Sequence, residues 1–272
     1  MWARAEGNVD RVRIEDADAI RHLREDYLRS LSAPVDGMWE SVVIGDAACW
    51  ALHDHGRHAG CYWVDAEDML LGIHLVSADD GEAAAIFRQV LDAHGIWQAR
   101  ASTGEPRFFA LCRDAGRVEA VEHYLFRDYQ RHAPTDTLDA GTFRKAERHE
   151  RAAFERFYRE NTAGDGAWIS AFLDELLRHQ ELFGLYERGV LVATGECIPS
   201  RFQPPYADLG VVVACQQRGQ GVGRSILARL KNQCYAAGWE PICSCGAANG
   251  ASKRAIEGAG FVSQHQIMRV VF

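Results

Sequence analysis

Hydrophobic and polar positions alternate along the chain in a way that predicts strands and helices in the same order in each half. In the second half, the apolar run of residues 209–213 predicts a strand, residues 225–231 have the helical period, residues 242–245 predict a strand, and Asn249 opens a helix. In the first half, a strand is predicted over 71–76, a helix over 82–93, a strand over 99–102 and a helix from Glu105. This internal similarity predicts a duplicated domain.

A polar segment containing Pro134 and Gly141 separates the halves and has the composition of a linker. The chain of 272 residues is long enough for two domains of about 130 residues each. We therefore predict a first domain over residues 1–130, a linker over 131–141 and a second domain over 142–272.

The most informative segment lies between the predicted strand at 209–213 and the helix that follows it. Gln216-Gln217-Arg218-Gly219-Gln220-Gly221-Val222-Gly223 is rich in glycine, which allows a positive φ and a close backbone approach to a ligand. The N–H groups at the start of a helix favour an anion, and Arg218 and Arg224 add positive charge. The pattern predicts a phosphate-binding loop.

Spacing distinguishes three kinds of phosphate-binding loop. A dinucleotide fingerprint counted from Gly219 needs a sixth-position glycine but meets Arg224, and a Walker A loop needs a lysine and an earlier glycine where Arg218 stands. The third pattern, Gln/Arg-x-x-Gly-x-Gly/Ala, is matched by Gln216, Gly219 and Gly221.

That third pattern is the pyrophosphate-binding signature of the GNAT acyltransferases, the Gcn5-related N-acetyltransferases. Asn249, a good helix N-cap, and the later Gly258-Ala259-Gly260-Phe261 resemble the second landmark of that family. The resemblance covers residues from about 142 to 272. It implies an α+β fold for each of two tandem domains, with a mixed, mostly antiparallel sheet flanked by helices.

The resemblance also implies acetyl-CoA as co-substrate and a set of cofactor-binding residues. Backbone groups of the predicted strand would pair with pantetheine, and the N–H of Val213 would donate to the thioester carbonyl. The implied cofactor-binding residues are Val211, Val212, Val213, Gln216, Arg218, Gly219, Gln220, Gly221, Val222, Gly223, Arg224, Asn249 and Ser252. Many members carry a tyrosine seven residues after the asparagine, where this chain has Ile256.

An acceptor ammonium must lose a proton before its nitrogen can attack, so a base is required. Glu196, on a strand predicted over 190–197, and Asp208, just before the next strand, are the two candidates. Trp168 lies in a loop that, in the family, covers the acceptor site, and it is a candidate to line the pocket or to anchor the loop. Tyr206 is a secondary candidate for the substrate site.

The first half lacks the phosphate-binding pattern. Asp79, Asp80 and Glu82 stand where the loop would be, and like charges repel one another and a phosphate. Glu105 and Phe108 occupy the places of Asn249 and Ser252. We therefore expect this copy not to bind CoA. Shielding the sheet edge, shaping the substrate cleft and forming a homodimer are the roles left open for it.

Composition and charge narrow the class of protein further. The formal net charge of −8 argues against a general nucleic-acid binder. No apolar run approaches a membrane span, and the residues after Met1 contain no secretory h-region. The eight cysteines form no CxxC pair and are expected to be buried, reduced thiols, which favours the cytoplasm. We expect no membrane or nucleic-acid partner.

Residues 53–58, His53-Asp54-His55-Gly56-Arg57-His58, are the best candidate for a metal site, but a solvated hairpin turn is favoured and no metal is expected. The sequence thus predicts an acetyl-CoA-dependent N-acyltransferase acting on a primary amine of a small molecule, amino acid derivative or peptide. The alternative is a non-catalytic acyl-CoA-binding or regulatory module, which the missing tyrosine at Ile256 suggests.

Overall fold

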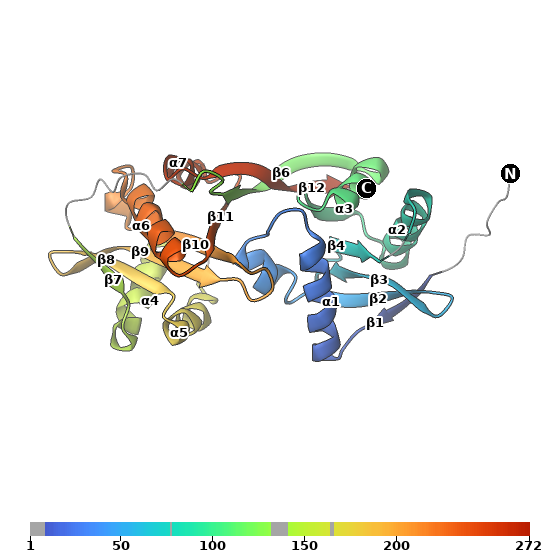
Figure 1. The fold of residues 1–272 in the computed structure, drawn as a ribbon, viewed down its shortest axis with the longest axis horizontal. Helices are drawn as coiled ribbons and strands as arrows, with labels where there is room; N and C mark the ends of the chain where they lie inside the picture. The colour runs from blue at the N-terminus through green and yellow to red at the C-terminus, as the bar shows by residue number, and fades with distance from the viewer. Residues whose placement is uncertain (1–8, 77, 132–140, 164–165) are drawn as a thin grey trace. The chain divides into compact units, whose positions relative to one another are not determined.

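A computed structural model describes residues 9–76, 78–131, 141–163 and 166–272 of the chain. Contacts divide it into two compact units, residues 1–124 with 265–272 and residues 125–264. Each unit combines a mixed sheet with flanking helices, which confirms the predicted α+β class (Figure 1). Residues 132–140 of the expected linker lie outside the described residues.

The first unit begins with β1 (Asp10–Arg13), α1 (Ala17–Ser30) and a short π-helical turn at Trp39–Val43. The elements that follow are β2 (Ala48–Asp54), β3 (Arg57–Val64), β4 (Leu70–Leu75), α2 (Asp80–His94), β5 (Gln98–Ser102), α3 (Pro106–Ala115) and β6 (Arg117–Arg127). Strands β1 to β4 pair antiparallel in sequence order, and β4 pairs parallel with β5.

The last strand of the chain, β12 (Val262–Val271), completes the sheet of the first unit. Ile267–Val271 pair antiparallel with Gln98–Ser102 of β5, and Val270 is fully buried in the core of this unit. The expected domain of residues 142–272 and the compact unit of residues 125–264 therefore differ at the C-terminal end. Strand β6 begins in the first unit, and its last three residues belong to the second unit.

The second unit contains β7 (Thr142–Lys145), a 3-10 turn at Arg148–Glu150, α4 (Arg151–Asn161), α5 (Ile169–His179), β8 (Leu182–Glu187) and β9 (Val190–Pro199). They are followed by β10 (Tyr206–Val213), a 3-10 turn at Cys215–Gln217, α6 (Val222–Ala236), β11 (Glu240–Gly246) and α7 (Gly250–Gly258). The strand order is β11-β10-β9-β8-β7, with β10 and β11 parallel and the other pairs antiparallel.

Helices cover both faces of this sheet (Figure 1). Side chains alternate between the two faces along each strand, so neighbouring residues of a strand contact different helices. A Cβ placed on Gly195 of β9 would lie 3.0 Å from Ile226 and Leu230, so α6 packs on that face. Helices α4 and α5 cover the other face through a buried apolar cluster that includes Phe154 and Leu173.

The order of elements confirms the predicted duplication. In the first unit a parallel pair of strands is joined through α2 (β4-α2-β5) and followed by α3. In the second unit β10-α6-β11 is followed by α7 in the same arrangement. Corresponding positions can therefore be compared between the two copies.

Candidate functional site

The glycine-rich loop runs from the end of β10 into α6. Gly219 and Gly221 have φ values of +77° and +84°, a conformation that side chains with a Cβ rarely adopt. Gly221 is the N-cap of α6, and no side chain among the described residues caps this helix or places a carboxylate in its first turn. The first N–H groups of α6 therefore face the loop without a competing acidic group.

Polar side chains of the loop are used to hold the loop itself. Arg218 donates from Nε to the carbonyl of Val213 at 3.1 Å and from Nη2 to the carbonyl of Asn161 at 2.6 Å. Gln220 donates to the carbonyl of Gln216 at 3.0 Å. These hydrogen bonds connect the loop to the ends of β10 and α4, so the Arg218 side chain stabilises the backbone conformation of the loop.

Strand β10 separates from β11 halfway along its length. The parallel ladder comprises Tyr206–Glu240, Ala207–Pro241 and Asp208–Ile242, although the described strands continue to Val213 and Gly246. Beyond Asp208, the edge of β10 that faces β11 is therefore open within the described residues.

The direction of the backbone groups along this open edge follows from one hydrogen bond. Ala214 donates its N–H to Val192 of β9 at 3.0 Å. Because successive residues of a strand point their N–H and C=O groups to opposite edges, Val211 and Val213 point theirs away from β9. Val212 points toward β9 and pairs with Thr194. The open edge thus carries the backbone of Val211 and Val213.

Helix α7 begins beside this region with a side-chain cap. The Asn249 Oδ1 atom accepts from the N–H of Ser252 at 3.0 Å. A Cβ on Gly223 of α6 would lie 3.6 Å from both Ala255 and Val213, so α6 packs closely on α7 and β10 at this end. Ile256, at the position where the resemblance implies a tyrosine in many members, is 3% exposed.

On the opposite face of the sheet, Glu196 of β9 lies in a buried polar cluster. Tyr158 of α4 donates its hydroxyl to Oε1 of Glu196, and Thr194 Oγ1 donates to the Tyr158 oxygen at 3.3 Å. Glu196 is 5% exposed, and a Cβ on Gly210 of β10 would overlap its carboxylate. A side chain at position 210 would therefore displace the Glu196 carboxylate from this place.

Burial controls the charge of this carboxyl group. Desolvation first, and then the nearby charge of Asp208, raise the pKa of Glu196 from 4.5 to about 8. Asp208 lies two residues before Gly210 on β10 and therefore on the same face of the sheet as Glu196. The two candidate bases are thus neighbours.

The two candidate substrate-site residues lie in different places. Trp168, 42% exposed, contacts Tyr158 with ring centroids 6.4 Å apart and Phe172 at 5.4 Å. Tyr206 begins β10, seven residues before Val213 and so about 23 Å along the strand, and stacks with Arg127 at 4.9 Å. Trp168 and Glu196 are therefore linked through Tyr158, whereas Tyr206 lies at the other end of β10.

Sequence patterns did not single out Tyr158 as a site residue. Its spacing from Phe154 and Phe157 is that of a core-facing helix stripe, and the three residues are indeed buried. The one available signal was a hydroxyl within that apolar stripe, since a buried tyrosine oxygen needs a hydrogen-bond partner.

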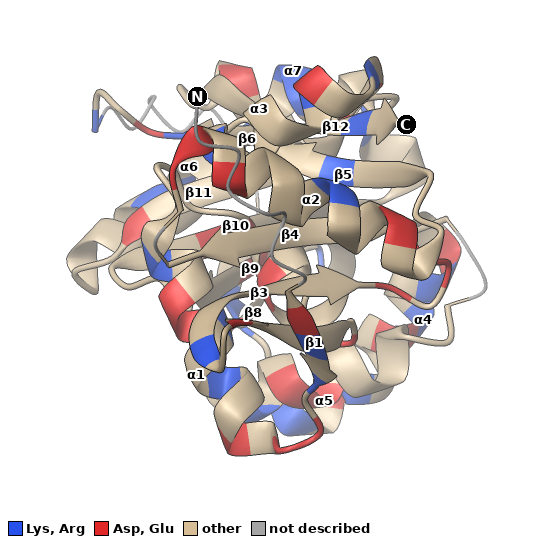
Figure 2. Ribbon diagram, turned by 90° about the vertical axis from the view of Figure 1, so that its right-hand side faces the viewer, with Lys and Arg blue, Asp and Glu red and all other residues tan. Residues whose placement is uncertain are grey.

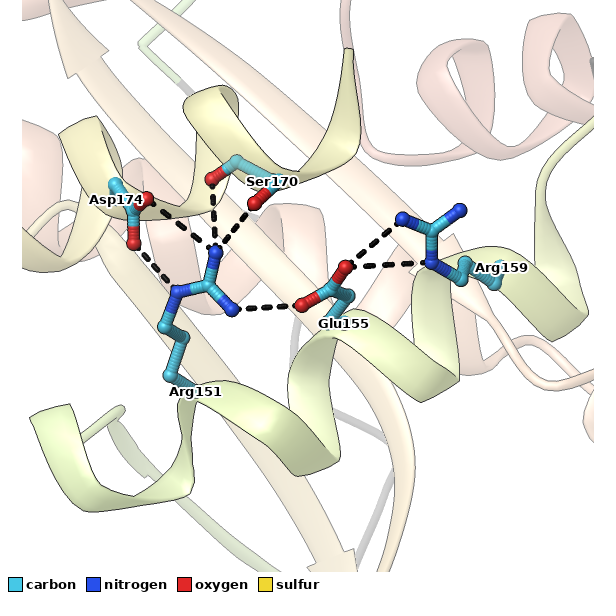
Figure 3. A network of polar contacts seen from close by, with 5 residues as sticks. All are labelled: Arg151, Glu155, Arg159, Ser170 and Asp174. Carbon is cyan, nitrogen blue, oxygen red and sulfur yellow. Dashed lines mark hydrogen bonds and ion pairs between the residues drawn. The ribbon is translucent and has the colours of Figure 1, made fainter. Parts of the chain in front are cut away.

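A polar network on the outer side fixes α4 against α5 (Figure 3). The guanidinium of Arg151 bonds Asp174 at 2.5 Å and Ser170 Oγ at 2.5 Å on α5, and Glu155 at 2.6 Å on its own helix. Arg159 bonds the same Glu155 at 2.8 Å. This network orients the helices that carry Tyr158 and Phe172.

The first unit has different groups at the corresponding positions. Asp79 caps α2 and accepts from the N–H of Glu82 at 2.9 Å, so side-chain carboxylates occupy this helix start. Arg107 of α3 donates to the carbonyls of Ala78 and Asp79, bridging α3 to the start of α2. Among the described residues, the start of α2 thus carries a side-chain cap and carboxylates in its first turn, where the start of α6 carries neither.

Other features of the chain bear on metal binding, membrane association and the state of the cysteines. Residues 53–58 lie in the expected hairpin, with the turn at His55-Gly56 between the paired ends of β2 and β3. The described residues contain no group of three or more His, Cys, Asp or Glu side chains suited to a metal. No described helix has the length and apolar character of a membrane span. Basic and acidic residues are interspersed on helices such as α1 and α7 (Figure 2).

The expectation that all the cysteines are buried was wrong at two positions, since Cys215 is exposed and Cys197 is partly exposed.

Comparison with protein-family models identifies the class. Residues 16–129 match a family model described as an acetyltransferase (GNAT) domain, and residues 141–261 match the acetyltransferase (GNAT) family. The chain therefore consists of two GNAT acetyltransferase domains in tandem. No curated protein sequence matches the chain.

Solved structures agree with this assignment. A GNAT-family acetyltransferase from Colwellia psychrerythraea is 27% identical, with a TM-score of 0.89 over 97% of this chain and 99% of that one. A GCN5-related N-acetyltransferase from Sphaerobacter thermophilus (14% identity, TM-score 0.65, 96% and 94% covered) and a tandem GNAT protein from the clavulanic acid biosynthesis pathway (12%, 0.64, 97% and 98%) share the fold.

Proposed function

We propose that the second unit transfers an acetyl group from acetyl-CoA to a primary amine, and that the first unit binds no CoA. The observation that carries this proposal is the uncapped start of α6 behind Gly219 and Gly221, next to the open edge of β10. In the first unit, Asp79 caps the corresponding helix.

The residues of the second unit fit an acyl-CoA thioester. N–H groups of residues 218–224 would bind the pyrophosphate, with Arg224 adding positive charge. Pantetheine would pair with Val211 and Val213 along the open edge, and Asn249 and Ser252 would line it. The N–H of Val213 would donate to the thioester carbonyl, where a donor of this kind contributes about 3–4 kcal/mol to the transition state.

Glu196 is the proposed base. The carboxylate of a group with a pKa near 8 is basic enough to remove a proton from an ammonium group at mildly alkaline pH. Asp208 acts through its charge, which raises the pKa of Glu196. Trp168 lies beside Tyr158 on the same side and is proposed to contact the acceptor.

The second candidate is a non-catalytic acyl-CoA-binding module, favoured by the buried Ile256 in place of a tyrosine acid. An assay for thiol release from acetyl-CoA over a panel of primary amines separates the two. Amine-dependent thiol release supports the enzyme. Tight CoA binding without release over the whole panel would support the module instead.

CoA binding itself is tested with Gly221→Asp. The new carboxylate would stand at the start of α6, as Asp79 stands at the start of α2, and we expect calorimetry to show loss of CoA binding. Gly238→Asp is the matched control, because Gly238 follows the same helix with a φ of +82° and open surroundings. It adds the same charge and the same backbone strain, and it should leave CoA binding intact. Equal losses in both variants would contradict the assignment of the loop.

A further inference from the structure

Glu196 is held from two sides. Tyr158 of α4 is 1% exposed and donates to Oε1, while Thr194 Oγ1 lies 3.5 Å from the same oxygen. The other oxygen lies over the backbone of Gly210. The carboxyl group therefore has a fixed orientation, set largely by one tyrosine hydroxyl.

The ring of the same tyrosine packs against aromatic side chains that extend to the protein surface. It contacts Trp168 at 6.4 Å and Phe172 at 6.2 Å, both close to edge-on, and Trp168 is 42% exposed. One side chain thus connects a buried acid to an exposed aromatic surface.

A tyrosine with only a structural role would also be buried and hydrogen-bonded, and Tyr27 of the first unit is an example for comparison. Tyr27 of α1 donates to Glu105 at 2.7 Å, and a Cβ on Gly72 of β4 would lie 2.7 Å from the Tyr27 hydroxyl. The ring of Tyr27, however, packs on Trp63, which is 0% exposed. The pair in the first unit is enclosed, and the pair in the second unit reaches the surface.

We infer, on the basis of the acetyl transfer proposed above, that Tyr158 is the positioning residue of Glu196 and joins it to the acceptor side of the site. Its hydroxyl orients the carboxylate and favours its charged form, because a donated hydrogen bond stabilises the anion. Its ring supports Trp168. The other charge acting on Glu196 is that of Asp208 on β10, and the residues that α5 and β8 pack into this cluster are apolar: Ile169, Leu173, Leu176, Leu177 and Leu182.

The step that this arrangement assists is a proton transfer followed by acyl transfer. The Glu196 carboxylate takes one proton from the acceptor ammonium, and the nitrogen lone pair forms a bond to the thioester carbon. The C–S bond then breaks, and the second proton of the nitrogen passes to the sulfur. Glu196 finally releases its proton to water.

Tyr158→Phe removes the hydroxyl and keeps the ring. We expect kcat with an amine that the wild type accepts to fall on the order of 10²-fold. The alkaline inflection of its pH profile should move to higher pH, because Glu196 loses the donor that stabilises its charged form. KM for the amine should change little. Carboxyl ¹³C NMR, with the Glu196 signal assigned from Glu196→Gln, should show the same upward shift without any acceptor.

Two variants separate this role from a structural one. Tyr27→Phe removes a buried tyrosine–glutamate bond of the same kind, to Glu105 in the first unit, and should lower the melting temperature while leaving kcat and its pH profile unchanged. Trp168→Ala should raise KM for the amine and leave the inflection unchanged. If Tyr158→Phe does not fold, Thr194→Val is used with the same readouts and a smaller expected shift.

The inference is overturned if Tyr158→Phe, or its substitute, changes only the melting temperature, as Tyr27→Phe does, and leaves kcat, the inflection and the Glu196 titration unchanged. Failure of the proposed function has a different signature, because the wild type would then release no thiol with any amine of the panel.

Discussion

Glu105 and Glu196 are both buried acids with a tyrosine donor, one in each unit, and the loss of their protons lowers the stability of the folded protein, whereas for Glu196 the same loss is what the proposed activity requires. Burial raises the pKa of each from 4.5 to about 8. The folded protein thus keeps protons that the unfolded chain releases above about pH 4.5. The corresponding stability is present below that pH and is lost as pH rises toward about 8.

Glu105→Gln removes one of these titrations without touching the proposed site. Urea unfolding between about pH 5 and pH 8 should show a slope shallower by about 1.4 kcal/mol per pH unit than in the wild type, because the folded and unfolded states no longer differ by this proton. Activity should be unchanged. An unaltered slope would mean that Glu105 titrates normally in the folded protein.

Glu196→Gln should flatten the stability profile in the same way and also affect catalysis. The rate of acetyl transfer in the wild type should rise as pH increases through about 8, where Glu196 becomes charged. In the variant this rise should disappear and the rate should fall on the order of 10²-fold or more. A variant that kept the wild-type pH-rate profile would exclude Glu196 as the base.

At the scale of elements, the parts that could be predicted from sequence are those set by local chemistry. The turn at Gly219 and Gly221, the cap at Asn249 and the acidic cap at Asp79 each depend on residues within a few positions of one another. The contact between Tyr158 and Glu196 joins residues 38 positions apart on different elements, so no local pattern reports it.

A buried ion pair between elements was likewise beyond prediction. Lys231 of α6 is fully buried, with Nζ 2.6 Å from Asp128 and donating to the carbonyl of Ala259 at 2.9 Å. The hydroxyl of Tyr235, one helical turn further along α6, donates to the same Asp128 oxygen at 2.6 Å. The pair connects α6 to the segment after β6 and to the end of α7.

Breaking this pair should be costly. Asp128→Leu leaves the Lys231 ammonium buried without its counter-charge and should lower the free energy of unfolding by about 3–5 kcal/mol. Lys231→Met should also destabilise. The double variant should regain much of the loss, because no buried charge remains unpaired. Additive losses in a urea double-mutant cycle would show that the two residues do not act as a pair.

At the scale of the whole chain, the tandem duplication was predictable because element order repeats, whereas the destination of the last strand was not. Strand β12 follows α7 of the second half in sequence, but its residues from His265 onward belong to the first compact unit. Alternation of buried positions such as Ile267 indicates a strand and gives no partner, since register depends on contacts with residues more than 160 positions away.

This division of the chain predicts which of the two units is destabilised by a substitution in β12. Val270 is fully buried in the core of the first unit and pairs with Ala99 of β5. Val270→Ala should cost about 2 kcal/mol by leaving a cavity, and hydrogen exchange should accelerate mainly in β5 and α2. Leu209→Ala on β10, also buried, is the control and should accelerate exchange in the second unit. Faster exchange in β9 and β10 on changing Val270 would instead show that the strand supports the half that precedes it in sequence.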